Sequence, residues 1–154
     1  GLAVGETRDE RESMTELAAA LLPANKPRYL MGVGTPIDLV EAVKRGVDMF
    51  DCIIPVKMAQ QGWVYTFDGK IRIQRREYRL SDEPLDRHCD CKACKSLTRG
   101  YVHHLLTAKH QLGWRMMAIH NLRHYQLLMH RMREAILAGT FESLYRELKE
   151  RLDG

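Results

Sequence analysis

The chain has 154 residues, a length that suits one ordinary domain and is too short for two comfortable ones. Hydrophobic residues make up 45% and charged residues 29%, which excludes disorder along the whole length, and no apolar run reaches the roughly 18 residues of a membrane-spanning helix. The formal net charge is +4, with 6 basic and 9 acidic residues in 1–55 but 18 and 11 in 56–154. The basic second part favours a polyanionic partner, although a solvated basic helix surface would carry the same charge.

The first half alternates predicted helices and strands. Acidic residues followed by apolar ones at helical spacing predict a helix over 7–22, and Pro23 ends it. A short apolar run over 29–33 predicts a buried strand. Thr35 as cap and Pro36 at the first helical position begin a second helix that stops at Gly46.

A second apolar strand is predicted over 47–54, closed by Pro55. Strand, helix and strand with short connections form a βαβ unit, so we predict an α/β fold with units of a barrel in this half. A complete barrel needs about 250 residues, and the chain starts abruptly in an apolar segment without Met. We therefore expect that it opens inside a domain and leaves apolar faces uncovered.

The second half has a different pattern. Two β-rich runs, 63–67 and 70–74, flank Asp68-Gly69 and predict a hairpin. A polar irregular stretch leads to a cysteine cluster. Further helices are predicted over 98–111, over 121–137 and from Thr140 to the end.

Cys89, Cys91 and Cys94 are crowded into six residues, which suits one metal ion better than disulfides. A structural zinc needs a fourth ligand, and spacing alone does not choose it. Thiolate ligands favour a reducing compartment, so the expected location is the cytoplasm. The candidate fourth ligands are His88, His103, His104, His110, His120 and His124.

Asp51 stands near the end of the second predicted strand, among apolar neighbours. Polar groups at the carboxyl ends of barrel strands carry chemistry, so Asp51 is a candidate nucleophile or proton-transfer group. A loop aspartate that bonds a backbone amide is the alternative, and Asp48 competes for the functional role. Gly32 and Gly34 would let the backbone approach a ligand closely, although a tight turn explains them equally well.

These pieces together resemble the tRNA-guanine transglycosylases, also called queuine tRNA-ribosyltransferases. The resemblance is to the carboxyl-terminal part of that family and covers essentially the whole chain. It rests on five ordered segments: 1–6 (GLAVGE), 29–34 (YLMGVG), 48–52 (DMFDC) with Pro55, 89–94 (CDCKAC) and 119–122 (IHNL).

The resemblance implies an α/β fold: the carboxyl-terminal portion of a TIM (β/α)8 barrel over 1–60, then a β-hairpin, a zinc-binding subdomain and carboxyl-terminal helices over 61–154. The family exchanges a guanine in the tRNA anticodon for a 7-deazaguanine base, a step of queuosine modification. Asp51 would be the nucleophile that holds the tRNA as a covalent glycosyl-aspartate, in two displacements like those of a retaining glycosidase.

The resemblance also assigns further residues. Gly1, Leu2 and Ala3 would line the base pocket, Glu6 would help to set specificity for the base, and Met31 would pack against it. One structural zinc ion would be held by Cys89, Cys91, Cys94 and His120, and the family forms homodimers through the zinc region.

One segment departs from the family pattern. Two arginines that hold the anticodon loop in bacterial members are replaced by Lys57 and Gln60, which cannot make forked phosphate contacts. Lys57 stays a candidate RNA contact. The altered segment keeps open a non-catalytic, zinc-stabilised RNA- or partner-binding relative, or a transglycosylase with a different nucleic-acid target.

Overall fold

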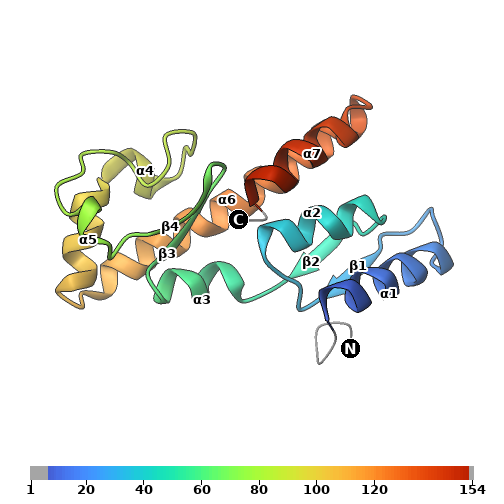
Figure 1. Ribbon diagram of the computed structural model, residues 1–154, viewed down its shortest axis with the longest axis horizontal. Helices are drawn as coiled ribbons and strands as arrows, with labels where there is room; N and C mark the ends of the chain where they lie inside the picture. Colours follow the sequence, from blue (N-terminus) through green and yellow to red (C-terminus); the bar gives the residue numbers. More distant parts are fainter. Residues whose placement is uncertain (1–6, 153–154) are drawn as a thin grey trace. The chain divides into compact units, whose positions relative to one another are not determined.

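The computed structural model describes residues 7–152, which fold into helices and short strands (Figure 1). In chain order these begin with α1 (Arg8–Leu21), β1 (Tyr29–Met31), α2 (Pro36–Lys44) and β2 (Met49–Asp51). Next come α3 (Ile54–Gln60), β3 (Trp63–Thr66), β4 (Gly69–Arg72) and the short 3-10 helix η1 (Arg76–Tyr78). The described chain ends with α4 (Lys92–Ser96), α5 (Arg99–Thr107), α6 (Gln111–Leu137) and α7 (Phe141–Leu152).

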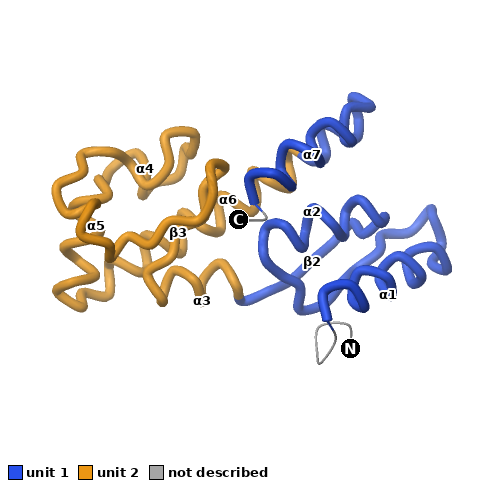
Figure 2. The backbone as a smooth tube through the Cα atoms, in the orientation of Figure 1, with its two compact units in different colours: residues 1–53, 132–153 blue, residues 54–131, 154 orange. Residues whose placement is uncertain are grey.

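The described residues group into two compact units (Figure 2). The residues up to Ile53, together with those from Met132 onward, form the first unit, and Ile54–Arg131 forms the second. The last turns of α6 therefore belong to the first unit with α7. The sequence predicted a division after residue 60, between a barrel portion and a zinc-binding part. The two compact units are defined by packing and do not test that division, which stays a prediction.

In the first unit, β1, α2 and β2 form the predicted parallel βαβ arrangement. Leu30 of β1 lies opposite Phe50 of β2. Thr35 caps α2 by accepting from the amide of Asp38, whose carboxylate accepts in return from the Thr35 amide. The small core on this side of the strands contains Leu30, Val33, Ala42 and Val47, with Phe50 packed against it.

The opposite face of the β1–β2 sheet is open among the described residues. Met31 is 68% exposed and Met49 is 52% exposed. The large apolar side chains of α1 also lie outside the core, since Met14, Leu17 and Leu21 are all about half exposed or more, although Ala19 is buried. Among the described residues, this part of the chain thus leaves apolar side chains exposed on the sheet and on α1, as the sequence predicted.

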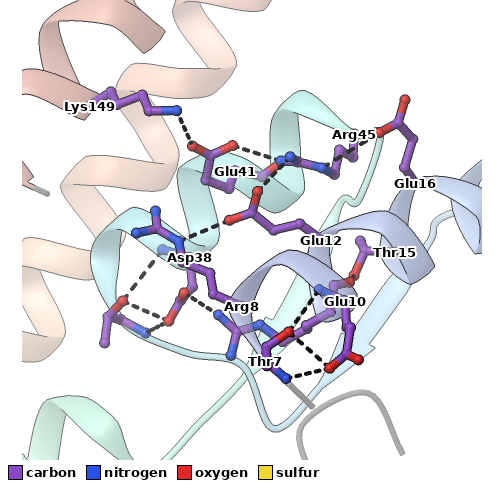
Figure 3. A network of polar contacts seen from close by, with 12 residues as sticks. Thr7, Arg8, Glu10, Glu12, Thr15, Glu16, Asp38, Glu41, Arg45 and Lys149 are labelled. Carbon is purple, nitrogen blue, oxygen red and sulfur yellow. Dashed lines mark hydrogen bonds and ion pairs between the residues drawn. The ribbon is translucent and has the colours of Figure 1, made fainter.

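A buried carboxylate ties α2 to α7 within the first unit (Figure 3). Glu41 is only 2% exposed, and it accepts hydrogen bonds from Arg45 at 2.7 Å and from the Tyr145 hydroxyl at 2.9 Å. Lys149 lies 3.2 Å from the same carboxylate. Burial raises the pKa of Glu41, but Arg45, Tyr145 and Lys149 outweigh burial and lower it to about 2.

In the second unit, β3 and β4 form the predicted hairpin, with Trp63 opposite Arg72. Gly62 precedes the hairpin with φ of +85°, a conformation that side chains rarely adopt, and an added Cβ there would meet Gln74 at 2.8 Å. β3 contacts α3, and Val64 and Ile73 lie in a core shared with α5 and α6. The buried core of this unit contains Ala59, Val64, Ile73, Leu85, Cys89, Cys91, Ala93, Val102, Met116, Met117 and Ala118.

Several predicted boundaries are wrong. The helix predicted over 98–111 is Arg99–Thr107, and the strand predicted over 29–33 is Tyr29–Met31. The strand predicted over 47–54 is only Met49–Asp51, and α3 starts at Ile54 because Pro55 fits the first turn of a helix, where its missing N–H costs no hydrogen bond. α6 starts at Gln111 rather than at residue 121. Gly113 weakens the helical pattern in the sequence, but it fits close contact with α5, since a Cβ there would lie 3.1 Å from Leu105.

Candidate functional site

Asp51 ends β2 at the carboxyl end of the parallel pair. It lies opposite Met31, the last residue of β1, so both strands end at the same edge. Asp51 and Met31 are exposed on the open face of the sheet. In parallel α/β arrangements this edge is where ligands bind.

Two donors hold the carboxylate of Asp51. The Tyr29 hydroxyl donates a short hydrogen bond to Oδ1, and the amide of Gly32 donates to the same oxygen at 3.1 Å. These donors, Tyr29 first, lower the pKa of Asp51 below its ordinary value. Asp51 is therefore a carboxylate at neutral pH, and no hydrogen bond from another described residue reaches its Oδ2.

The competing residue Asp48 has a different position. Its carboxylate accepts from the backbone amide of Arg28 at 2.8 Å, just before β1 and β2 begin. Asp48 thus joins the starts of the two strands, at the end away from Asp51. Asp51 also accepts from a backbone amide, that of Gly32, which is the contact expected under the alternative interpretation of Asp51.

Tyr29 is a site residue that the sequence did not reveal. Tyr29 and Met31 alternate along β1, so they share a face, but only the register of β1 against β2 brings Tyr29 to Asp51. Lys57 lies exposed on α3. The pocket residues that the resemblance assigns, Gly1, Leu2, Ala3 and Glu6, lie outside the described residues.

The structure brings the cysteine cluster and one histidine together. The ligand atoms of Cys89, Cys91, Cys94 and His120 all lie within 4.8 Å of one another. His120 Nδ1 lies 3.2 Å from Cys94 Sγ and 3.7 Å from Cys91 Sγ. Three sulfurs and one imidazole nitrogen at these separations fit one four-coordinate metal ion.

The orientation of His120 also fits a metal ligand. Its Nε2 bonds the backbone carbonyl of Tyr65 at 2.8 Å, so the proton belongs on Nε2 and the lone pair of Nδ1 faces the sulfurs. The Cys94 side chain, His120 and the Cys94 amide lower the pKa of Cys91, although burial opposes them. Cys91 is therefore favoured as a thiolate, the form in which cysteine binds metal, whereas Cys91 itself and burial raise the pKa of its partner Cys94.

Neighbouring contacts fix the cluster on α6. Arg123 makes a forked pair with Asp90, at 2.6 and 2.9 Å, which anchors the cysteine loop one helical turn from His120. Asn121 is fully buried, and its Oδ1 accepts from the Tyr65 amide at 3.0 Å. Its Nδ2 donates to the carbonyls of Pro55 and Trp63 at 2.9 and 3.1 Å.

The other candidate fourth ligands lie elsewhere. His103 Nδ1 bonds the carbonyl of Ile73 at 2.9 Å, and His110 accepts from the Leu112 amide. His124 is buried beside the rings of Tyr65, Phe67 and Tyr125. Four protein ligands leave no open position for catalysis, so the cluster suits a structural metal site. The chain is thus an α/β protein with an exposed carboxylate at a strand edge and a separate Cys3His cluster.

Comparison with known proteins agrees with this class. The profile of the family described as Queuine tRNA-ribosyltransferase (TGT) matches residues 1–153. The chain belongs to the queuine tRNA-ribosyltransferase family.

Curated relatives share nearly half of its residues. The Queuine tRNA-ribosyltransferase of Nitrosomonas europaea is 48% identical over 147 residues, which are 96% of this chain and 40% of that protein. That of Mannheimia succiniciproducens is 47% identical over 153 residues, 99% of this chain and 40% of its own length. The chain therefore spans about 40% of these relatives and corresponds to their carboxyl-terminal part. Within residues 7–152 no helix has the length and apolar content needed to span a membrane.

Proposed function

We propose that the protein carrying this chain exchanges a guanine in the tRNA anticodon for a 7-deazaguanine base, as a tRNA-guanine transglycosylase. The observation that carries the proposal is the exposed carboxylate of Asp51, held ionised by Tyr29 and Gly32 at the carboxyl edge of β2. Membership of the queuine tRNA-ribosyltransferase family supports the substrate class.

In the first step, Asp51 attacks C1′ of the ribose. A bond forms between the carboxylate and C1′ while the bond from C1′ to the guanine nitrogen breaks, and its electron pair leaves with guanine, which takes up a proton. Because Tyr29 and Gly32 both occupy Oδ1, Oδ2 is the oxygen suited to attack. The deprotonated ring nitrogen of the 7-deazaguanine then forms the new bond to C1′ and releases the carboxylate.

The remaining assignments belong to the same proposal. Met31 lies beside Asp51 at the strand edge, where its exposed side chain can pack against a base. Gly1, Leu2, Ala3 and Glu6 complete the base pocket by resemblance. The βαβ arrangement forms the last units of a TIM barrel, and Lys57 contacts RNA as a single positive charge.

The metal of the Cys3His cluster is zinc, by the same proposal. Three thiolates and an imidazole suit Zn2+, and a closed set of ligands gives it a structural role. Thiolate ligands suit a reducing compartment such as the cytoplasm. A homodimer formed through the zinc region follows from the resemblance.

Covalent trapping tests the proposal. The protein carrying this chain, mixed with substrate tRNA, should form an RNA adduct that survives denaturation, and Asp51→Asn should abolish it. Asp48→Asn is the matched control, because it removes a carboxylate from the other end of β2 and keeps an oxygen that can accept from Arg28. An adduct in the Asp51→Asn variant would refute the nucleophile. Salt-dependent RNA binding without any adduct would favour the alternative, a non-catalytic relative. The presence of Lys57 and Gln60 in place of two arginines of the family supports that alternative.

A further inference from the structure

Positive charge is concentrated around the β3–β4 hairpin of the second unit. Residues 57–79 contain six Lys and Arg residues against two Asp and Glu residues, an excess of four that equals the net charge of the whole chain, +4. Apart from Lys57, a proposed RNA contact, none of these cations has a role in the proposed catalysis or in the Cys3His cluster. Their arrangement therefore calls for its own explanation.

Two of these cations gather at one indole ring. Trp63 on β3 lies directly opposite Arg72 on β4, and the side chain of Lys70 projects from the same face of the hairpin. Lys70 Nζ lies 5.0 Å from the centroid of the Trp63 ring, and Arg72 Cζ lies 5.8 Å from it. We call Trp63, Lys70 and Arg72 the hairpin patch.

The hairpin that carries the patch is packed against the core of the second unit. On the other face of the hairpin Val64 is fully buried, and Ile73, just after β4, is also fully buried in the core of the unit. The buried Asn121 holds the backbone carbonyl of Trp63. The backbone that carries Trp63, Lys70 and Arg72 is therefore fixed by the packing of the hairpin, and the two cations lie beside the indole ring.

Within residues 7–152 no acidic side chain balances the charges of the hairpin patch. Lys70 and Arg72 are exposed, and in the part of the chain that the structure describes no carboxylate lies within ion-pair distance of either. The only side-chain hydrogen bond described for Arg72 joins its Nε to Gln74 at 3.4 Å. Its terminal guanidinium nitrogens thus remain available for an anion.

We infer that the hairpin patch binds the phosphate backbone of single-stranded or loop RNA, with Lys70 and Arg72 on phosphates and Trp63 against a base or ribose. Cations interleaved with an aromatic ring are the combination that binds unpaired nucleic acid, because the ring contacts the flat base while the cations neutralise the backbone. An anionic membrane would need the cations but not the indole. The inference rests on the proposed function, because that function makes an RNA loop the partner.

RNA binding by the full chain, loaded with zinc, tests the inference. The probe is a labelled anticodon stem–loop RNA, and its affinity is measured at several salt concentrations. Lys70→Ala with Arg72→Ala should weaken binding about tenfold and lower the slope of log affinity against log salt by roughly 1.4, the value for two phosphate contacts on a single strand. Arg115→Ala, which removes an exposed cation of α6 in the same unit, should change neither quantity.

A second pair of variants tests the aromatic contribution. Trp63→Leu should weaken binding several-fold, while Trp63→Phe, which keeps a ring, should restore most of it. Vesicles containing phosphatidylserine serve as the competing anionic surface. Unchanged RNA affinity in the double variant, equal loss with Trp63→Phe and Trp63→Leu, or tighter binding to the vesicles than to RNA would each overturn the hairpin assignment. None of these results bears on the proposed nucleophile, because the covalent adduct at Asp51 is measured in a separate experiment.

Discussion

Tyr29 is the side chain that most directly controls the ionisation of Asp51. Its hydroxyl donates to Asp51 Oδ1 and is the largest cause of the lowered pKa of that carboxyl. Tyr29→Phe should therefore raise the pKa of Asp51, because one of two donors to the ionised form is lost. Carboxyl carbon shifts followed by NMR during an acid titration would measure the change.

The amide of Gly32 remains a donor in the Tyr29→Phe variant. The pKa of Asp51 should therefore rise but stay below the ordinary value of an aspartate. Tyr125→Phe is a suitable control, because Tyr125 lies in the second unit beside Tyr65 and His124. If the pKa of Asp51 stays the same after Tyr29→Phe, the hydrogen bond does not set the ionisation of the site.

Asn121 is a buried residue of α6 that bonds three backbone groups of the second unit. Its amide satisfies the Tyr65 N–H and the carbonyls of Pro55 and Trp63. Asn121→Ala leaves these groups without a partner and should lower the free energy of unfolding by roughly 3 kcal/mol. Urea unfolding of the zinc-loaded chain would measure the loss.

Two further variants show whether hydrogen bonding is the cause. Asn121→Asp keeps an acceptor for the Tyr65 amide but loses the donor to Pro55 and Trp63, so it should also be destabilised. Gln126→Ala removes an exposed amide from the same helix and should change stability by less than about 0.5 kcal/mol. Equal stability of Asn121→Ala and Gln126→Ala would contradict the role assigned to Asn121.

The sequence predicted the site residues that lie close together along the chain. It did not predict those that come together only through strand pairing and tertiary packing. Cys89, Cys91 and Cys94 form a recognisable pattern because their spacing alone allows a shared ion. Tyr29 and Asn121 gave no such signal. Their roles depend on the pairing of β1 with β2 and on the packing of α6 against β3, which hydrophobic periodicity does not specify.

At the scale of elements, Glu41 makes the contact between α2 and α7 dependent on pH. Its pKa falls from 4.5 to about 2 in the folded chain, so its contribution to stability is complete above about pH 5 and is lost as the pH drops through 2. The loss should be on the order of 3 kcal/mol. Urea unfolding between pH 7 and pH 2 would measure it.

The comparison with Glu41→Gln isolates this carboxylate. The variant should be less stable than the unaltered chain at pH 7 and should lose less stability on acidification, because no proton is taken up at residue 41. Acid effects common to both proteins, such as protonation of the cysteine cluster, cancel in the difference. Glu134→Gln, an exposed change on α6, should leave the pH dependence as it was.

The elements themselves followed from local signals where those signals were strong. Thr35 with Pro36 predicted the start of α2, and Asp68-Gly69 predicted the hairpin turn. α3 was missed because Ile53 and Ile54 extend the apolar pattern of the strand before them. Local sequence does not show that β2 ends at Asp51, since that end depends on its partner strand β1.

For the molecule as a whole, the two units should respond differently to loss of metal. Cys89 and Cys91 belong to the core of the second unit, together with Val64, Ile73 and Met117. The first unit is held instead by its own strand pair and by the ionic contacts of Glu41. Removing the metal, zinc by our proposal, should therefore open the second unit and leave much of the first protected.

Hydrogen exchange read by mass spectrometry would resolve the two units. With a zinc chelator, amides in 54–131 should lose protection, while those of α1, α2 and α7 keep most of theirs. Cys91→Ser should reproduce this pattern and lower the zinc content, whereas Cys52→Ser, a change outside the cluster, should do neither. Uniform loss of protection in both units would show that the chain unfolds as one cooperative body. Unchanged exchange after complete removal of zinc would mean that the core around Val64 and Met117 holds without the metal.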